Sequence, residues 1–126
     1  MTTAIAPVLV VDDNHELLEL IEMLLLNSGY PAIAVQSSAQ ALELARKQRF
    51  SALFTDLVMP GLNGHELIKA VRDTEDNREL PVVIMSGLAM SEQVIDQPGI
   101  YHLEKPFSLA DFNKALERAL VWQAVH

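Results

Sequence analysis

The fold is decided by the stretch Ala52-Leu53-Phe54-Thr55-Asp56-Leu57-Val58-Met59-Pro60-Gly61, in which an apolar run delivers one carboxylate directly before a turn. Short apolar runs bounded by turn residues are typical of strands buried in a sheet. Pro60 and Gly61 favour a turn and end the strand. We therefore expect Asp56 to lie at the tip of a buried strand, where the chain leaves the core.

Three further apolar runs end in polar side chains, as this one does. Asp12 and Asp13 follow residues 8–11, and Ser86 follows residues 82–85. Residues 100–103 are followed by Glu104 and then by Lys105. Segments with the apolar spacing of amphipathic helices separate these runs and a weaker one at residues 31–35. Three of the helices are expected to begin at capping pairs: Ser37 with Gln40, Asn63 with Glu66, and Ser108 with Asp111.

Strand and helix therefore alternate five times, which predicts an α/β fold with a parallel sheet and helices on both faces. The pattern is weakest at residues 88–95, and Pro98 and Gly99 interrupt it, so we expect the fourth helix to be short or irregular. Ligands of such sheets bind beyond the carboxyl ends of the strands. The polar side chains at the strand ends should therefore converge on one edge: Asp12, Asp13, Asp56, Ser86 and Lys105.

The carboxylates of this set need a cation. Three acids placed close together repel one another, and burial makes their charged forms costlier unless a positive charge lies among them. Mg²⁺ is the expected ion because it prefers oxygen ligands. The chain has no cysteine, and no pair of histidines lies near these positions, which argues against zinc. Lys105 adds a positive charge and Ser86 a hydroxyl, which completes the set that an aspartyl phosphate requires.

Four motifs carry a resemblance to a known family: Val10-Val11-Asp12-Asp13-Asn14, the run from Asp56 to Gly64, Met85-Ser86-Gly87 and Lys105-Pro106-Phe107. In this order and spacing they resemble the receiver domain of two-component response regulators, the CheY-like superfamily. The resemblance implies a flavodoxin-like, doubly wound sheet of five parallel strands in the order 2-1-3-4-5. We expect one such domain over residues 1–126, with its core at about residues 8–120.

The resemblance also implies a role for each residue at the strand ends. Asp56 would take a phosphoryl group from a phosphohistidine on a sensor histidine kinase or a histidine phosphotransfer protein. Ser86 would be the switch hydroxyl, Lys105 would contact the phosphoryl group, and the bond between Lys105 and Pro106 would be cis. The implied magnesium ligands are Asp12, Asp13, Asp56 and the backbone carbonyl of Val58. Such a domain is a switch that assists its own phosphorylation and dephosphorylation, and it is not a turnover enzyme.

One position departs from the family pattern. Receiver domains usually carry an aromatic residue three positions before the lysine, and that residue swings inward on phosphorylation. This chain has His102 there, with Tyr101 beside it. Neighbouring side chains of a strand point to opposite faces, so Tyr101 is not expected to replace it. Two hypotheses stay open: His102 is the rotating switch residue, or the aromatic switch is absent.

The composition limits the class of partner. The formal net charge is −8, which argues against direct nucleic-acid binding and favours protein partners with basic patches. No apolar run approaches the ~18 residues of a membrane helix. The first residues lack the features of a signal peptide, so the expected location is the cytoplasm. We expect a monomer or a phosphorylation-dependent dimer, and the sequence does not name its downstream target.

Two other functions stay open. A haloacid-dehalogenase-like phosphatase also uses an aspartyl nucleophile with Mg²⁺, but that family has a second acid two residues later, where this chain has Val58. A receiver-like interaction module that works without phosphorylation usually lacks the acid or the lysine, and this chain has both Asp56 and Lys105. The function expected first is therefore a phosphoacceptor receiver that switches partner binding.

Overall fold

The computed structural model describes residues 5–58, 61–87 and 97–126. Its strands are β1 (Val8–Val11), β2 (Ala32–Val35), β3 (Ala52–Asp56), β4 (Val82–Ser86) and β5 (Ile100–Glu104). Its helices are α1 (His15–Asn27), α2 (Ser38–Lys47), α3 (Gly64–Arg72) and α4 (Leu109–Val125), with a short 3₁₀ helix, η1, at Glu75–Asn77. The helix predicted at residues 88–95, with its short or irregular form, lies outside the described residues.

The strands pair in parallel in the order β2-β1-β3-β4-β5, which confirms the predicted topology. Val11 near the end of β1 is opposite Thr55 of β3, and Asp56 is opposite Met85 of β4. Because parallel strands all point the same way, their carboxyl ends share one edge of the sheet. The residues that follow β1, β3, β4 and β5 therefore meet at that edge.

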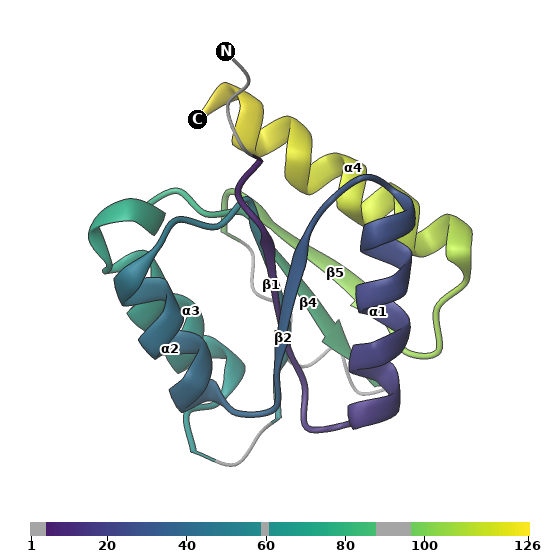
Figure 1. The fold of residues 1–126 in the computed structure, drawn as a ribbon, viewed down its shortest axis with the longest axis horizontal. Helices are drawn as coiled ribbons and strands as arrows, with labels where there is room; N and C mark the ends of the chain where they lie inside the picture. Colours follow the sequence, from purple (N-terminus) through teal and green to yellow (C-terminus); the bar gives the residue numbers. More distant parts are fainter. Residues whose placement is uncertain (1–4, 59–60, 88–96) are drawn as a thin grey trace.

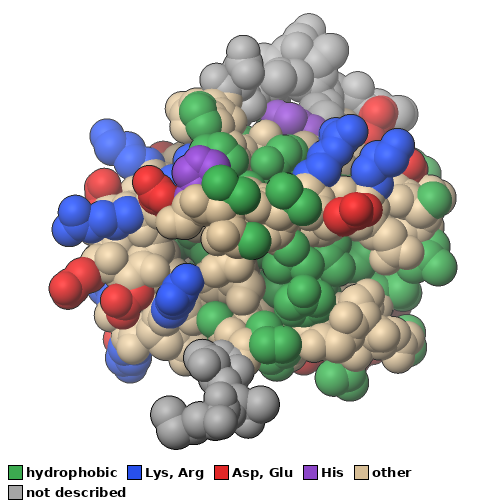
Figure 2. All heavy atoms as spheres, turned by 90° about the horizontal axis from the view of Figure 1, so that it is seen from above, with side chains coloured by type: hydrophobic (Ala, Val, Ile, Leu, Met, Phe, Trp, Pro, Cys, Tyr) green, Lys and Arg blue, Asp and Glu red, His purple; other side chains and the backbone are tan. Residues whose placement is uncertain are grey.

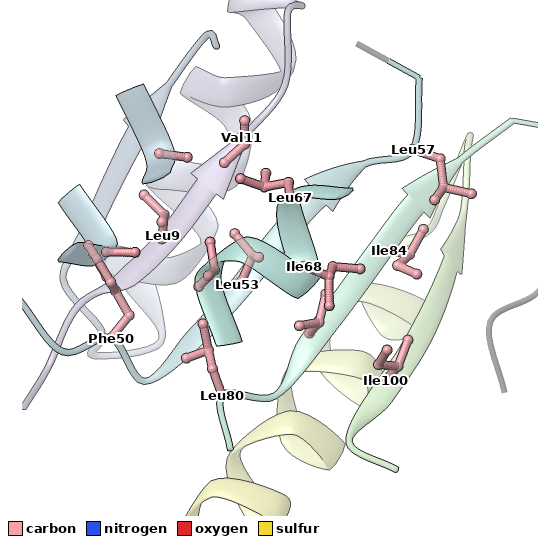
Figure 3. Close-up of a cluster of buried hydrophobic side chains, with 14 residues drawn as sticks. Leu9, Val11, Phe50, Leu53, Leu57, Leu67, Ile68, Leu80, Ile84 and Ile100 are labelled. Atoms are coloured by element: carbon pink, nitrogen blue, oxygen red, sulfur yellow. The ribbon is translucent and has the colours of Figure 1, made fainter. Parts of the chain in front are cut away.

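Among the described residues, two helices cover each face of the sheet. Figure 1 shows α2 and α3 together on one side and α1 and α4 on the other. Leu53 belongs to the apolar cluster under α2 and α3, part of which is drawn in Figure 3, whereas its neighbour Phe54 packs under α1 and α4. Alternation along a strand produces this division. Since both faces are covered, β1 and β3 are apolar at consecutive positions, as buried parallel strands are.

The predicted helix starts are confirmed by their caps. Reciprocal capping boxes join Asn63 with Glu66 at α3 and Ser108 with Asp111 at α4. At α2 the side chain of Ser37 accepts the backbone N–H of Gln40 at 3.2 Å. These side chains satisfy N–H groups that the first turn of a helix leaves unpaired. None of the helices within the described ranges is long and apolar enough to cross a membrane.

The amino-terminal edge of the sheet is held by Asn77, a buried residue of η1. Its Oδ1 accepts the backbone N–H of Phe50 at 2.9 Å, and its Nδ2 donates to the carbonyl oxygens of Ala45 and Gln48 at 2.9 and 3.1 Å. Buried polar groups need such partners, because an unpaired one costs about 1–3 kcal/mol. Asn77 therefore fixes the turn between α2 and β3 against η1.

The same edge joins α3 and α4 to the sheet. Arg72, the last residue of α3, donates to the carbonyl oxygen of Leu80 from Nε at 3.0 Å and from Nη2 at 2.8 Å. Trp122 of α4 donates its Nε1–H to the carbonyl oxygen of Glu79 at 3.0 Å. Gly99 has a φ of 76°, and a Cβ there would lie 2.7 Å from the Trp122 ring. A glycine is needed at this point on both counts.

Candidate functional site

Asp56 is the last residue of β3, and its side chain is 16 % exposed at the carboxyl edge of the sheet. Its Oδ1 accepts the backbone N–H of Val58 at 3.3 Å. The backbone N–H of Gly64 donates to the carbonyl oxygen of Leu57 at 2.8 Å, which ties the chain after β3 to the start of α3. A rigid strand thus presents a carboxylate that solvent still reaches.

Asp12 and Asp13 follow β1, the strand beside β3. Asp12 is buried and its Oδ1 accepts the backbone N–H of Asn14 at 2.9 Å, whereas Asp13 is exposed. The cap of α1 is Asn14, whose side chain accepts the backbone N–H of Leu17 at 3.2 Å, so neither acid is needed for capping. One carboxylate oxygen from each of Asp12, Asp13 and Asp56 lies within 4.8 Å of the other two. The structure therefore brings the three acids together.

Lys105 lies between two of these acids. Its Nζ is 2.8 Å from Oδ2 of Asp12 and 3.4 Å from Oδ2 of Asp56. The shorter distance is that of a strong charge-assisted hydrogen bond, and the longer one is a looser ion pair. The Lys105–Pro106 bond is cis, as expected, and the backbone N–H of Lys105 donates to the carbonyl oxygen of Ser86 at 2.7 Å. Lys105 thus links β5 to the acids that follow β1 and end β3.

Opposing effects act on the pKa of Lys105. Partial burial is the largest single effect and lowers the pKa, because it disfavours the charged ammonium. The hydrogen bond to Asp12 and the negative charges of Asp12 and Asp56 raise it by more in total, so that the pKa lies above the ordinary 10.5. Lys105 is therefore positively charged at neutral pH, where it offsets part of the charge of the three acids.

Ser86 ends β4 at the same edge. The preceding residue, Met85, is opposite Asp56 in the sheet. The Ser86 hydroxyl is buried, and none of the described residues forms a hydrogen bond with it. A buried hydroxyl gains from a partner, since leaving it unpaired is costly. Ser86 can therefore donate to an acceptor that arrives beside Asp56.

His102 lies on the Ser86 face of the sheet. His102 of β5 is opposite Ile84 of β4, and opposite residues of neighbouring strands share a face. Ser86 is two positions after Ile84 on the same strand, so its side chain lies on that face as well. Tyr101 packs instead against the cluster under α1 and α4. The side chain of Tyr101 thus points away from the face on which a switch residue would approach Ser86.

Two contacts that support the site were missed in the sequence. Ser38, at the start of α2, is buried, and its Oγ accepts the backbone N–H of Leu62 at 3.0 Å from 24 positions away. A Cβ on Gly64 would lie 2.8 Å from the carbonyl oxygen of Asp56. No local pattern signals either contact, because each depends on how separate elements pack.

Comparison with known proteins agrees with this geometry. Residues 8–117 match the model of the response regulator receiver domain family. The chain belongs to this family. The receiver is 32 % identical over 116 residues to the polar-differentiation response regulator DivK of Brucella ovis, a match that covers 90 % of this chain and 94 % of that protein. It is therefore a phosphoacceptor switch of two-component signalling, as the sequence predicted.

Solved structures give the same result for the fold. The receiver matches the chemotaxis protein CheY4 of Vibrio cholerae with a TM-score of 0.82 and 28 % identity, over 93 % of this chain and 100 % of that one. It matches the receiver domain of the sensor histidine kinase PA1611 of Pseudomonas aeruginosa with a TM-score of 0.81 and 29 % identity, over 94 % and 99 %. That second structure has a magnesium ion coordinated in its active site cleft. The predicted flavodoxin-like receiver fold is confirmed.

Proposed function

We propose that Asp56 is the phosphoacceptor of this receiver and that it takes its phosphoryl group from a phosphohistidine. The donor would be a sensor histidine kinase or a histidine phosphotransfer protein. The observation that carries this proposal is the position of the Asp56 carboxylate, which is partly exposed while Lys105 Nζ lies 3.4 Å away. A nucleophile must reach its substrate, and a fixed cation must lie where charge develops.

The transfer uses one oxygen of Asp56 as the nucleophile. The bond between phosphorus and the histidine nitrogen breaks, a bond between phosphorus and the Asp56 oxygen forms, and the nitrogen keeps the electron pair. Because Asp12 holds Lys105 at 2.8 Å, the ammonium group is already in place to stabilise the phosphoryl oxygens. In this way the receiver assists its own phosphorylation, and later its hydrolysis by water, without other turnover chemistry.

The acids of the site fit Mg²⁺. Asp12, Asp13 and Asp56 provide oxygen donors only, and three negative charges face the single charge of Lys105. These acids would hold the ion together with the backbone carbonyl of Val58. Bound there, Mg²⁺ would neutralise negative charge on the group being transferred. The magnesium ion in the cleft of the PA1611 receiver supports this assignment.

Ser86 and His102 would carry the switch. The Ser86 hydroxyl would donate to a phosphoryl oxygen on Asp56, and His102 on the same face would follow its movement. We expect His102→Ala to weaken the response of the receiver to beryllofluoride, a phosphoryl mimic. Tyr101→Phe is the comparison and should respond as the parent does. Amide NMR spectra with and without the mimic measure this response. Equal responses of His102→Ala and the parent would show that His102 is not the rotating residue.

The partner class, location, domain extent and oligomeric state of the receiver are proposed from its composition and length. The net charge of −8 supports protein partners with basic patches rather than nucleic acid. We place the receiver in the cytoplasm, as one domain over residues 1–126 with its core at about residues 8–120, and as a monomer or phosphorylation-dependent dimer. Sedimentation of the phosphorylated and unphosphorylated chain distinguishes these two states.

Intact mass after treatment with acetyl phosphate and Mg²⁺ tests the central claim. The parent is expected to gain the mass of one phosphoryl group, and Asp56→Asn none. Asp76→Asn is a matched control, because Asp76 is an exposed acid of η1 at the opposite edge of the sheet, and it should gain the group as the parent does. The proposal is contradicted if Asp56→Asn gains the phosphoryl mass, or if neither the parent nor Asp56→Asn gains it.

A further inference from the structure

A groove of about 440 Å³ runs between α4 and the turn that follows α1. One wall is formed by Ser28 and Tyr30, which lie between α1 and β2. The other wall is a stripe of α4 that includes Asn113, Glu117, Val121 and Ala124. Tyr30 precedes β2, so the groove lies toward the amino-terminal edge of the sheet and away from Asp56. Its residues take no part in the site described above.

The groove exposes apolar surface. Val121 on its rim is 60 % exposed, and Leu120 and Tyr30 are only half-buried. Figure 2 looks onto α4 from above and shows hydrophobic side chains gathered in a hollow, with charged side chains beside it. A contiguous hollow of this kind differs from singly scattered apolar residues, which need no explanation.

The shape of the groove suits a helix. Its α4 residues lie at positions 113, 116, 117, 120, 121 and 124, so they recur with the period of a helix and form a single stripe from Asn113 to Ala124. That stripe extends about 16 Å along the helix axis. A second helix can lie along such a stripe and place its own apolar residues in the hollow.

The charges around the groove select a cationic partner. Glu117 is the only charged side chain among the described residues that line it. The two cations nearest in α4, Lys114 and Arg118, line a different hollow, beside β5. The exposed surface of neighbouring α1 carries glutamates and no lysine or arginine. A second copy of this acidic chain would bring like charges together, so a basic partner fits better.

We propose that this groove binds an amphipathic helix of a partner protein, with leucine-like residues in the hollow and lysine or arginine beside Glu117. The partner would occupy the amino-terminal side of the molecule. The edge with Asp56 would remain open, so a phosphohistidine donor and this helix can bind together. Binding at the groove therefore does not depend on the proposed role of Asp56.

An NMR titration tests the proposal. The probe is an ~18-residue helical peptide of leucine and lysine, long enough to form a helix, with a leucine and glutamate peptide of the same pattern as its counterpart. The cationic peptide is expected to shift the amide signals of Tyr30 and of residues 113–124. Val121→Lys should weaken its affinity at least about tenfold, because it places a cation in the hollow. Val125→Lys is the matched control, since Val125 is 74 % exposed on the same helix but outside the groove, and it should change the affinity by less than about twofold.

Removal of the Glu117 charge gives a second test of the groove. Glu117→Gln should weaken binding and reduce its dependence on salt, whereas Glu43→Gln on α2, at the other face of the sheet, should do neither. Four results would overturn the proposal. These are no binding of the cationic peptide, signal shifts on another surface, equal binding of the acidic peptide, and dimerisation of the receiver through this groove.

Discussion

At the scale of single residues, Lys105 joins two acids of unequal accessibility. Asp12 is fully buried and holds Nζ at 2.8 Å, while Asp56 is reachable and lies at 3.4 Å. In the proposed transfer, an arriving phosphoryl group would compete with the looser of the two ion pairs. The tight pair with Asp12 would keep the ammonium group in place during this exchange, so little of the site would have to rearrange.

The raised pKa of Lys105 predicts a loss of stability in strong base. A group whose pKa is higher in the folded protein stabilises the fold fully below its unfolded pKa, here 10.5, and stops doing so as the pH rises through the folded value. The free energy of unfolding should therefore fall above about pH 10.5. Urea melts between about pH 8 and pH 12 measure this fall.

Lys105→Met isolates that contribution from those of the other side chains. The variant should start less stable than the parent by about 1–3 kcal/mol, because the buried Asp12 loses its partner. The difference between the two proteins should then shrink in base. A difference that stays constant across the pH series contradicts the assigned role. Lys114→Met, on the exposed surface of α4, serves as the neutral comparison.

At the scale of elements, the start of α3 is pressed against the end of β3. A Cβ on Gly64 would lie 2.8 Å from both the carbonyl oxygen of Asp56 and the Cα of Leu57. These are backbone atoms, which cannot move aside as a flexible side chain can. Any displacement of the Asp56 backbone therefore reaches the first turn of α3 directly.

Gly64→Ala is accordingly expected to destabilise the receiver by about 1–3 kcal/mol, as overpacking does. It should also slow phosphorylation by acetyl phosphate, because the carboxylate shifts with its backbone. Gly87→Ala is the matched control, since a Cβ there meets no described atom within 4 Å. Urea melts and intact mass measure the two effects. Equal stability of the two variants would show that α3 can move away from β3 without a loss in the free energy of unfolding.

The sequence predicted those parts of the elements that depend on local signals. Asp56 at a strand tip and the cap pair of Asn63 with Glu66 follow from residues close together in the chain. Ser38 and Asn77 could not be predicted in the same way. The partners of their side chains lie 24 and 27 positions away, at Leu62 and Phe50, and only the packed fold brings them together.

At the scale of the whole molecule, charge and metal should act together on stability. The chain carries a net charge of −8, and three of its acids meet at one edge of the sheet. Added salt weakens the general repulsion between acids, whereas Mg²⁺ would also bind the folded state specifically. The specific part is about 1.4 kcal/mol at ten times the dissociation constant.

Mg²⁺ is therefore expected to stabilise the receiver more than NaCl of the same ionic strength. Asp13→Asn should remove this surplus, and it is a mild change because Asp13 is exposed. Asp76→Asn, which removes one negative charge as Asp13→Asn does, should keep it. Thermal melts in the two salts make the comparison. Equal stabilisation by both salts would argue against a specific magnesium site.

The position of Trp122 makes the receiver its own optical reporter. It is the only tryptophan of the chain, and its ring is fixed beside Gly99 with Nε1–H on the carbonyl oxygen of Glu79. Its emission therefore follows the docking of α4 on the sheet, and unfolding of every variant named above is visible without a dye. Since the ring lies at the edge opposite Asp56, metal binding alone should leave the emission unchanged. A change on phosphorylation would thus record a signal that has crossed the whole sheet.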